Sequence, residues 1–237
     1  MRSFLKVIIF FLLGFACIGY GAISKPAIAK KSGASFTKLH ALQCKKSAYQ
    51  LSQYENQLII LDAGHGGTDE GTKASTVFEK KITLITALLA KQYLEELGYK
   101  VKMTRTSDVF LALPKRVALA NQAGAALFVS IHYNHSKNDL AKGIEVFYPD
   151  AKQLWRAHAS KRLARCVLSQ LLQETDAPSR GVKEGNFHVI RETEMPAVLI
   201  EGGFVSNLEE RELLKSKEYL GKVAKGVAQG IHRYLRS

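Results

Sequence analysis

One stretch of the chain decides the fold: Leu58-Ile59-Ile60-Leu61-Asp62-Ala63-Gly64-His65-Gly66-Gly67. Aliphatic residues that run into a glycine-rich segment are typical of a buried strand followed by a sharp turn. We expect a long amphipathic helix from about Glu79 to Leu97 and a second strand at Lys100–Met103. The order strand, helix, strand predicts neighbouring parallel strands joined by a covering helix.

The same alternation continues towards the C-terminus. Further expected elements are a helix near Pro114–Gln122, strands at Ala126–Ile131 and Ile144–Tyr148, a helix of about Ala151–Glu174, strands at Val189–Ile190 and Ala197–Ile200, and a closing helix at Leu213–Leu235. With 237 residues, 46% of them hydrophobic, the chain can bury one sizeable core and is too apolar for a disordered protein. The pattern predicts one α/β domain at residues 57–237, with a largely parallel sheet between helices.

The N-terminus has the pattern of an export signal. Arg2 and Lys6 precede an apolar run at residues 7–18, and the small-residue triplet Ala27-Ile28-Ala29 follows. This arrangement predicts a secretory signal peptide at residues 1–29, cleaved after Ala29. We therefore expect an exported protein, periplasmic or secreted, without stable membrane insertion after cleavage. A retained membrane anchor and lipidation at Cys17 are the alternatives.

Charge and cysteine content narrow the possible partners. Residues 30–56 are rich in Lys, Ser, Ala and Gln and predict a basic tether rather than a second domain. The formal net charge of +13 favours an anionic partner, but export argues against nucleic acid. After removal of the leader only Cys44 and Cys166 remain, too few for a cysteine zinc site. A metal ion would therefore need other ligands.

Potential ligands follow three of the expected strands. His65 follows the first strand, His132 follows the strand at Ala126–Ile131, and Glu201 follows the last strand. Functional groups in such sheets gather beyond the carboxyl ends of the strands. Imidazole and carboxylate groups are ligands of catalytic zinc, which takes three protein ligands and leaves one position for water or substrate. The sequence therefore indicates a zinc hydrolase.

Each of these residues also has a purely structural interpretation. His65 could be an exposed turn histidine, although glycines on both sides favour a close approach to a ligand. His132 could be a buried histidine at a strand end. Glu79 begins the expected helix and could simply interact with the helix dipole, so spacing alone leaves its role open. Glu201 emerges from a buried strand, where a carboxylate near a metal makes a good general base.

Several motifs occur in order between about Leu58 and Tyr234. They are Ile60–Gly67, Phe78-Glu79-Lys80, Thr104-Arg105, Ala120-Asn121, Val129–Asn134 and Pro196–Asn207. Together they resemble the zinc-dependent N-acetylmuramoyl-L-alanine amidases of the amidase type 3 family, which includes cell-division amidases. The resemblance implies an α/β fold with a central sheet of about six strands between helices, and one zinc ion. It also implies cleavage of the amide between N-acetylmuramic acid and the first L-alanine of the peptidoglycan stem peptide.

The resemblance also implies residue roles. His65, Glu79 and His132 look like the zinc ligands, and Glu201 looks like the catalytic base. The loop before Glu79 departs from the family pattern, because Asp69-Glu70-Gly71 stands where Asp-Pro-Gly is common. We expect peptidoglycan as the partner of a monomeric enzyme that acts in cell-wall remodelling and cell separation.

Other polar residues are weaker candidates. Asn134 is expected to contact substrate. Glu145 and His188 could face the site from neighbouring strands, although a supporting or surface position is the plainer interpretation. Arg105, Asp108 and Arg116 are expected to form structural ion pairs.

A second enzymatic interpretation rests on a short motif. Ser35-Phe36-Thr37-Lys38 fits the S-x-x-K pattern of penicillin-sensitive serine D,D-carboxypeptidases, so Ser35 and Lys38 could supply an additional activity. The pair lies in the expected tether, where a nucleophile would lack a rigid support. A non-enzymatic wall-binding protein is a further alternative, but all four groups of the expected zinc site are present.

Overall fold

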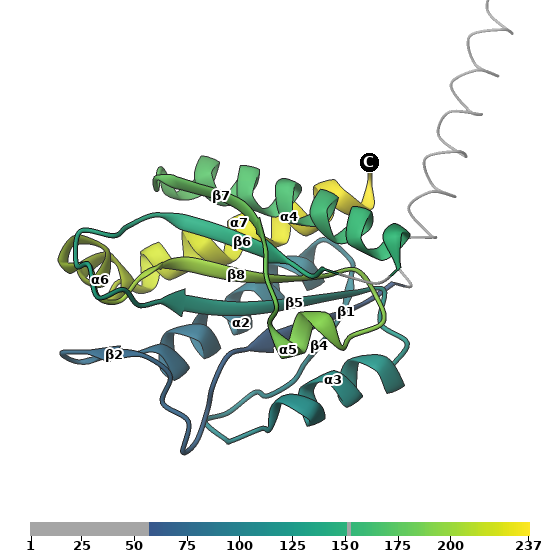
Figure 1. Cartoon of the computed structure of the whole chain (residues 1–237), viewed down its shortest axis with the longest axis horizontal. Coiled ribbons are helices and arrows are strands. Elements are labelled where there is room, and N and C mark those ends of the chain that lie inside the picture. Colours follow the sequence, from purple (N-terminus) through teal and green to yellow (C-terminus); the bar gives the residue numbers. More distant parts are fainter. Residues whose placement is uncertain (1–56, 151–152) are drawn as a thin grey trace, which may run out of the picture. The chain divides into compact units, whose positions relative to one another are not determined.

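The computed structural model describes residues 57–150 and 153–237. These residues form a six-stranded sheet with helices on both faces (Figure 1), as the sequence predicts. The expected signal peptide (1–29), the expected tether (30–56) and the Ser35 and Lys38 pair lie outside the described residues. Within the described ranges, no helix combines the length and the apolar character needed to cross a membrane.

The sheet is mostly parallel. Its strand order is β4 (Lys100–Met103), β1 (Leu58–Ala63), β5 (Leu127–Asn134), β8 (Ala197–Phe204), β6 (Ile144–Tyr148) and β7 (Ser179–Glu184). Neighbouring strands are parallel except for β6, which runs antiparallel to β8. The central strands β1, β5 and β8 are aliphatic and buried, as expected for a sheet covered on both faces. A separate small hairpin joins β2 (Lys73–Ala74) to β3 (Val77–Phe78).

The helices cover the two faces unequally. The larger hydrophobic cluster packs α2 (Glu79–Glu96), α4 (Leu154–Thr175) and α7 (Lys217–Leu235) against one face of the sheet. The smaller cluster lies on the other face, beneath α3 (Leu113–Gln122) and the single-turn α5 (His188–Arg191). Helix α6 (Leu208–Leu214) follows β8 and precedes α7. Figure 1 shows α3 and α5 on the side of the sheet away from α4 and α7.

The smaller cluster leaves part of its face uncovered. Phe128 of β5 and Leu199 of β8 belong to this cluster. Because side chains alternate along a strand, His132 and Glu201 project from the same face, nearer the carboxyl ends of β5 and β8. The short α5 does not cover them, so both residues line a pocket.

Two expected elements are wrong. Val189–Ile190 lies in α5, where both side chains are buried against the sheet by one helical turn. The sixth strand is instead β7, which the sequence analysis missed because an edge strand reading Ser-Arg-Gly-Val-Lys-Glu lacks an aliphatic run. The expected closing helix Leu213–Leu235 is two helices, because Ser216 caps the start of α7 by accepting a hydrogen bond from the Tyr219 backbone.

Candidate active site

Two buried arginines hold the loop that follows β1. Arg105 and Arg116 together donate to the carbonyl oxygens of residues 63–65, at distances of 2.7 to 3.0 Å. Arg116 also pairs with Asp62, whose carboxylate oxygen lies 2.8 Å from its guanidinium. The expected ion pairs are therefore present for Arg116 and for Asp108, which pairs with Lys80. The arginines fix the backbone at the point where the chain turns towards the pocket.

His65 itself has a strained backbone. Its φ of 59° lies in the left-handed region, which costs a residue with a Cβ atom about 1–2 kcal/mol. Gly66 and Gly67 continue the turn with φ values of 131° and 60°. The hydrogen bond from Arg116 to the His65 carbonyl stabilises this conformation. Such strain, when the surroundings enforce it, is a mark of functional sites.

Replacing Arg116 with methionine should lower the free energy of unfolding by about 3–5 kcal/mol, because it leaves a buried carboxylate without its charged partner. Burial raises the pKa of Asp62, but Arg116, Thr104 and Ser130 outweigh burial and hold it below 3.8. The stabilisation by the Arg116–Asp62 pair is therefore present above pH 3.8 and is lost as the pH falls through the pKa of Asp62 in the folded chain. Urea unfolding should show a large deficit near neutral pH that shrinks in acid. Arg165→Met, at an exposed position on α4, is the control, and an equal loss in both variants would contradict this account.

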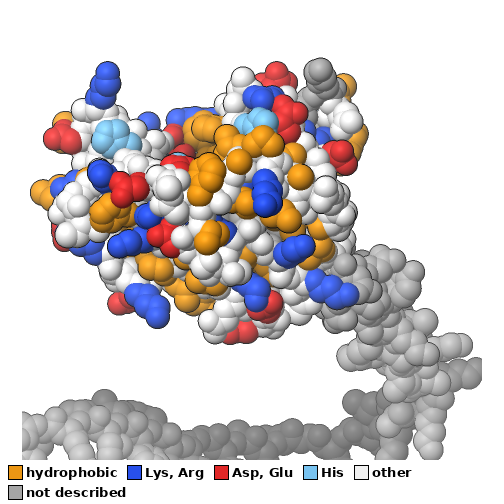
Figure 2. Space-filling view, turned by 90° about the horizontal axis from the view of Figure 1, so that it is seen from below, with side chains coloured by type: hydrophobic (Ala, Val, Ile, Leu, Met, Phe, Trp, Pro, Cys, Tyr) orange, Lys and Arg blue, Asp and Glu red, His pale blue; other side chains and the backbone are white. Residues whose placement is uncertain are grey.

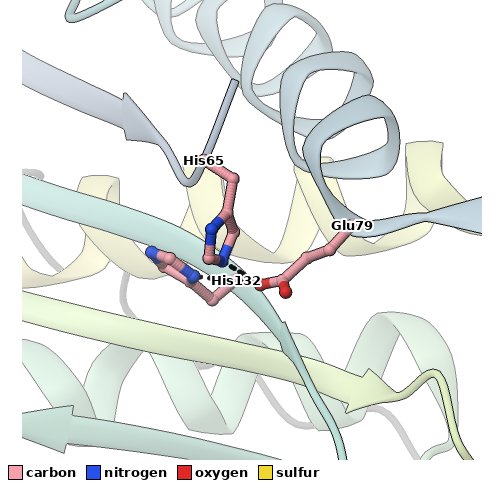
Figure 3. A group of neighbouring side chains, drawn as sticks. All are labelled: His65, Glu79 and His132. Atoms are coloured by element: carbon pink, nitrogen blue, oxygen red, sulfur yellow. Dashed lines mark hydrogen bonds and ion pairs between the residues drawn. The ribbon is translucent and has the colours of Figure 1, made fainter. Parts of the chain in front are cut away.

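Three predicted ligands converge beside this loop (Figure 3). Possible ligand atoms of His65, Glu79 and His132 lie within 4.8 Å of one another. His65 Nε2 lies 3.1 Å and His132 Nδ1 lies 3.0 Å from the same oxygen, Glu79 Oε1. The structure thus brings together the three residues that the resemblance pairs with zinc. Two imidazoles and one carboxylate match the donor set of a catalytic zinc site.

Glu79 is held firmly although it begins a helix. Its side chain is buried, and its two oxygens accept hydrogen bonds from the backbone N–H groups of Thr72 and Tyr133, at 2.8 and 3.1 Å. Burial raises the pKa of Glu79, but hydrogen bonds and charge interactions with His132 and His65 outweigh burial and hold the pKa far below 4.5. A carboxylate that stays ionised is ready to bind a cation. The loop preceding Glu79 thus presents it to the two histidines despite its departure from the family pattern.

Gly64 explains how the His132 ring reaches this position. A Cβ atom added at Gly64 would lie 2.3 Å from Cε1 of His132, closer than any real contact. The absence of a side chain at this point of the β1 loop therefore leaves the space that the imidazole fills. The residues form a cradle that fits a small metal ion with nitrogen and oxygen ligands.

Asp69 is a site residue that the sequence analysis did not identify. Its Oδ2 lies 2.9 Å from Nδ1 of His65, and its Oδ1 accepts a hydrogen bond from the Gly71 backbone. Burial lowers the pKa of His65, but Glu79 and Asp69 outweigh burial and raise it. A carboxylate on the far nitrogen of a ligand histidine fixes the tautomer and the orientation of the ring. The signal was its place four residues after His65, in the same glycine-rich turn.

Asp69→Asn should weaken zinc binding by about 10–100-fold, because the amide no longer orients His65 with a negative charge. Competition with a chelator would measure the change in Kd. Glu70→Gln is a matched control, because the neighbouring carboxylate pairs with Lys73 at the surface. Unchanged zinc affinity in Asp69→Asn, or equal losses in both variants, would rule out the positioning role.

The ligands open into a pocket of about 410 Å³. Its remaining walls combine apolar side chains with polar ones, namely Leu113, Phe187, Val189, Leu199, Thr72, Tyr133, Asn134, His135, His188 and Glu201. Asn134 is one of these lining residues, and His188 reaches the pocket from α5 rather than from a strand. Glu145 is not a lining residue but accepts a hydrogen bond from Asn134 Nδ2 at 2.7 Å.

Glu201 is the second carboxylate of the pocket. It pairs in register with His132 on the neighbouring strand, and its buried Oε2 has no hydrogen-bond partner among the described residues. Burial raises the pKa of Glu201 well above 4.5, and the negative charges of Glu79 and Glu145 add to this effect. A carboxyl group of raised pKa that faces a pocket is suited to taking up a proton. The fold and the side chains of the site are those expected of a metal-dependent hydrolase.

Comparison with known proteins identifies the family of the chain. Residues 59–233 match the family model described as N-acetylmuramoyl-L-alanine amidase, so the chain belongs to this family. The sequence-based resemblance is confirmed. A penicillin-sensitive serine activity at Ser35 and Lys38 gains no support from these similarities.

Three of the similar proteins show the extent of the match. An uncharacterised protein of Bacillus subtilis, YqiI, is 37% identical over 194 residues, which cover 82% of this chain and 92% of that one. The N-acetylmuramoyl-L-alanine amidase CwlM of Bacillus licheniformis is 39% identical, with 74% of this chain and 67% of that one covered. The catalytic domain of the amidase CwlV from Bacillus (Paenibacillus) polymyxa superposes with a TM-score of 0.71 at 38% identity, covering 76% and 98% of the two chains.

Proposed function

We propose that this chain is a zinc-dependent amidase that hydrolyses the amide between the lactyl group of N-acetylmuramic acid and the L-alanine of the peptidoglycan stem peptide. The observation that carries the proposal is the convergence of His65, Glu79 and His132 beside Glu201 in one pocket. Membership of the N-acetylmuramoyl-L-alanine amidase family supports the choice of bond.

The proposed metal ligands are His65 Nε2, His132 Nδ1 and the Glu79 carboxylate. A zinc ion bound there supplies a Lewis acid for the lactyl carbonyl and lowers the pKa of water. Asp69 keeps Nε2 of His65 turned towards Glu79 by occupying the opposite ring nitrogen. Arg105 and Arg116 fix the backbone of residues 63–65, so His65 is in place before substrate binds.

Glu201 is proposed to move the proton. It accepts a proton from the water whose oxygen attacks the lactyl carbonyl carbon. It then gives that proton to the L-alanine nitrogen as the carbon–nitrogen bond breaks. The second proton of the water passes from the new lactyl carboxyl group to the amine, so the products are a lactyl carboxylate and an L-alanine ammonium group. Its raised pKa supports this role, because the carboxyl group must hold the proton between the two steps.

The setting of the enzyme is also part of the proposal. We infer export through the signal peptide at residues 1–29, followed by a basic tether at residues 30–56 and a catalytic domain at residues 57–237. Peptidoglycan remodelling and cell separation are the proposed roles of a monomeric enzyme. The positive net charge supports attraction to an anionic cell wall.

Mass spectrometry of the products tests the proposed bond. Purified, zinc-loaded protein should release from sacculi stem peptides with a free L-alanine amino terminus, leaving glycan strands that carry lactyl carboxylates. Chelation should stop the release, and added zinc should restore it. Products cut within the glycan or between peptide residues, or no products at all, would refute the proposal.

A further inference from the structure

A row of side chains crosses the open face of the sheet, from the proposed metal ligands towards the edge strand. His132 on β5 is the register partner of Glu201 on β8, and Glu201 is the register partner of Glu145 on β6. Residues directly opposite each other on neighbouring strands project from the same face. His132, Glu201 and Glu145 therefore follow one another across three adjacent strands, with β7 beyond them.

Two basic side chains end this row. The Glu145 carboxylate is buried, and its Oε2 pairs with both Arg180 Nε, at 3.1 Å, and Lys183 Nζ. Its other oxygen accepts the hydrogen bond from Asn134, which lines the pocket. Two cations thus share one carboxylate, which leaves one positive charge in excess beside the pocket.

Both cations are accessible. The side chains of Arg180 and Lys183 are 36% and 42% exposed, so a ligand can reach them. The Arg180 guanidinium lies 4.8 Å from the centre of the Phe204 ring, which fixes its position. Figure 2 shows a face of the molecule on which Lys and Arg side chains are dispersed among apolar and polar ones. Arg180 and Lys183, in contrast, converge on one buried carboxylate, which is a specific arrangement.

The proposed reaction sets the direction of the substrate. Glu201 must reach the leaving nitrogen, and Glu201 lies on the β6 side of His132. The leaving peptide therefore starts on that side and continues towards Glu145. Two inter-strand steps separate His132 from Glu145, a distance of about 10 Å between backbones. An extended peptide covers about 3.3–3.6 Å per residue, so this distance corresponds to two or three residues.

We propose that Arg180 and Lys183 form a binding subsite for a carboxylate of the leaving peptide, carried by the residue that follows L-alanine. The inference rests on the proposed amidase function, because that function sets the direction of the peptide. Glu145 is the positioning residue that holds the two cations and Asn134 together. The subsite makes the enzyme selective for stem peptides whose second residue keeps a free acid over those in which it is amidated.

Binding without turnover tests the subsite. The full chain carrying Glu201→Gln, loaded with zinc, is titrated calorimetrically with two muramyl tripeptides that differ only in an acid or an amide on the second residue. The acid should bind on the order of tenfold more tightly, as expected for a charge-assisted contact. Lys183→Gln and Arg180→Gln in the same background should remove most of this preference while leaving the Kd of the amide unchanged. Lys91→Gln, a lysine paired with Glu95 on the opposite face, is the control.

Equal affinities of the Glu201→Gln chain for the acid and amide peptides would overturn the subsite. Arg180 or Lys183 variants that bind both peptides equally more weakly would also overturn it. Because Arg180 also contacts Phe204, the Lys183 variant separates loss of the subsite from loss of structure. Failure of the proposed function has a different signature, since it appears as absent or wrongly placed cleavage of sacculi by the unsubstituted chain. The binding preference is measured whether or not cleavage occurs.

Discussion

Glu201→Gln should lower kcat for stem-peptide release by about 10²–10⁴-fold while zinc remains bound, as expected when a general base is removed. Glutamine keeps the size of the side chain but cannot accept the proton from water or return it to the L-alanine nitrogen. Steady-state kinetics on sacculi, with the zinc content of the same samples, would measure both quantities. A variant that keeps more than about a tenth of the activity would remove Glu201 from the role of base.

The same substitution should stabilise the metal-free protein at neutral pH. Burial and the nearby charges of Glu79 and Glu145 raise the pKa of Glu201 in the folded chain. The unfolded chain therefore releases the Glu201 proton at a lower pH than the folded chain. As the pH rises above 4.5, this difference lowers the free energy of unfolding. The Tm of Glu201→Gln should exceed that of the unsubstituted chain near neutral pH, and the difference should vanish in acid. Glu218→Gln, at an exposed site on α7, should show neither effect.

His132→Ala should abolish stoichiometric zinc binding and lower kcat/KM by about three orders of magnitude or more, because catalytic zinc needs three protein ligands and contributes several kcal/mol to the reaction. His65→Ala should do the same. Zinc content by elemental mass spectrometry and hydrolysis of sacculi would measure both losses.

His135→Ala is the matched control for these ligand variants. His135 lines the same pocket but is not one of the converging residues, so its removal should leave the zinc content unchanged. A His132→Ala protein that binds zinc as tightly as the unsubstituted chain would contradict the assignment. Loss of zinc from His135→Ala would contradict it equally.

The sequence predicted those features that depend on apolar runs and on strand ends. Leu58–Leu61 and Ala197–Ile200 are strands because continuous aliphatic residues fit a sheet buried on both faces. The expected positions of His65, His132 and Glu201 followed from the rule that strand carboxyl ends meet at one edge. β7 escaped prediction because an edge strand needs few apolar residues. Val189 and Ile190 were assigned wrongly because two adjacent aliphatic residues fit either a strand or a single helical turn.

Contacts between distant segments could not be read from periodicity. The position of Glu79 depends on hydrogen bonds from Thr72 and Tyr133, two residues far apart in the sequence that the fold brings to the same carboxylate. Asp69 acquires its role from the left-handed turn at His65, a conformation that the flanking glycines suggest but do not determine. Arg105 and Arg116 were expected in ion pairs, yet most of their hydrogen bonds go to backbone carbonyls of the β1 loop.

Anomalous diffraction from a crystal of the zinc-loaded chain tests the central claim most directly. Data collected on either side of the zinc absorption edge identify both the element and its position. The proposed site predicts one anomalous peak between Nε2 of His65, Nδ1 of His132 and the carboxylate of Glu79. A zinc peak bound elsewhere, or no zinc peak among these three residues, would contradict it.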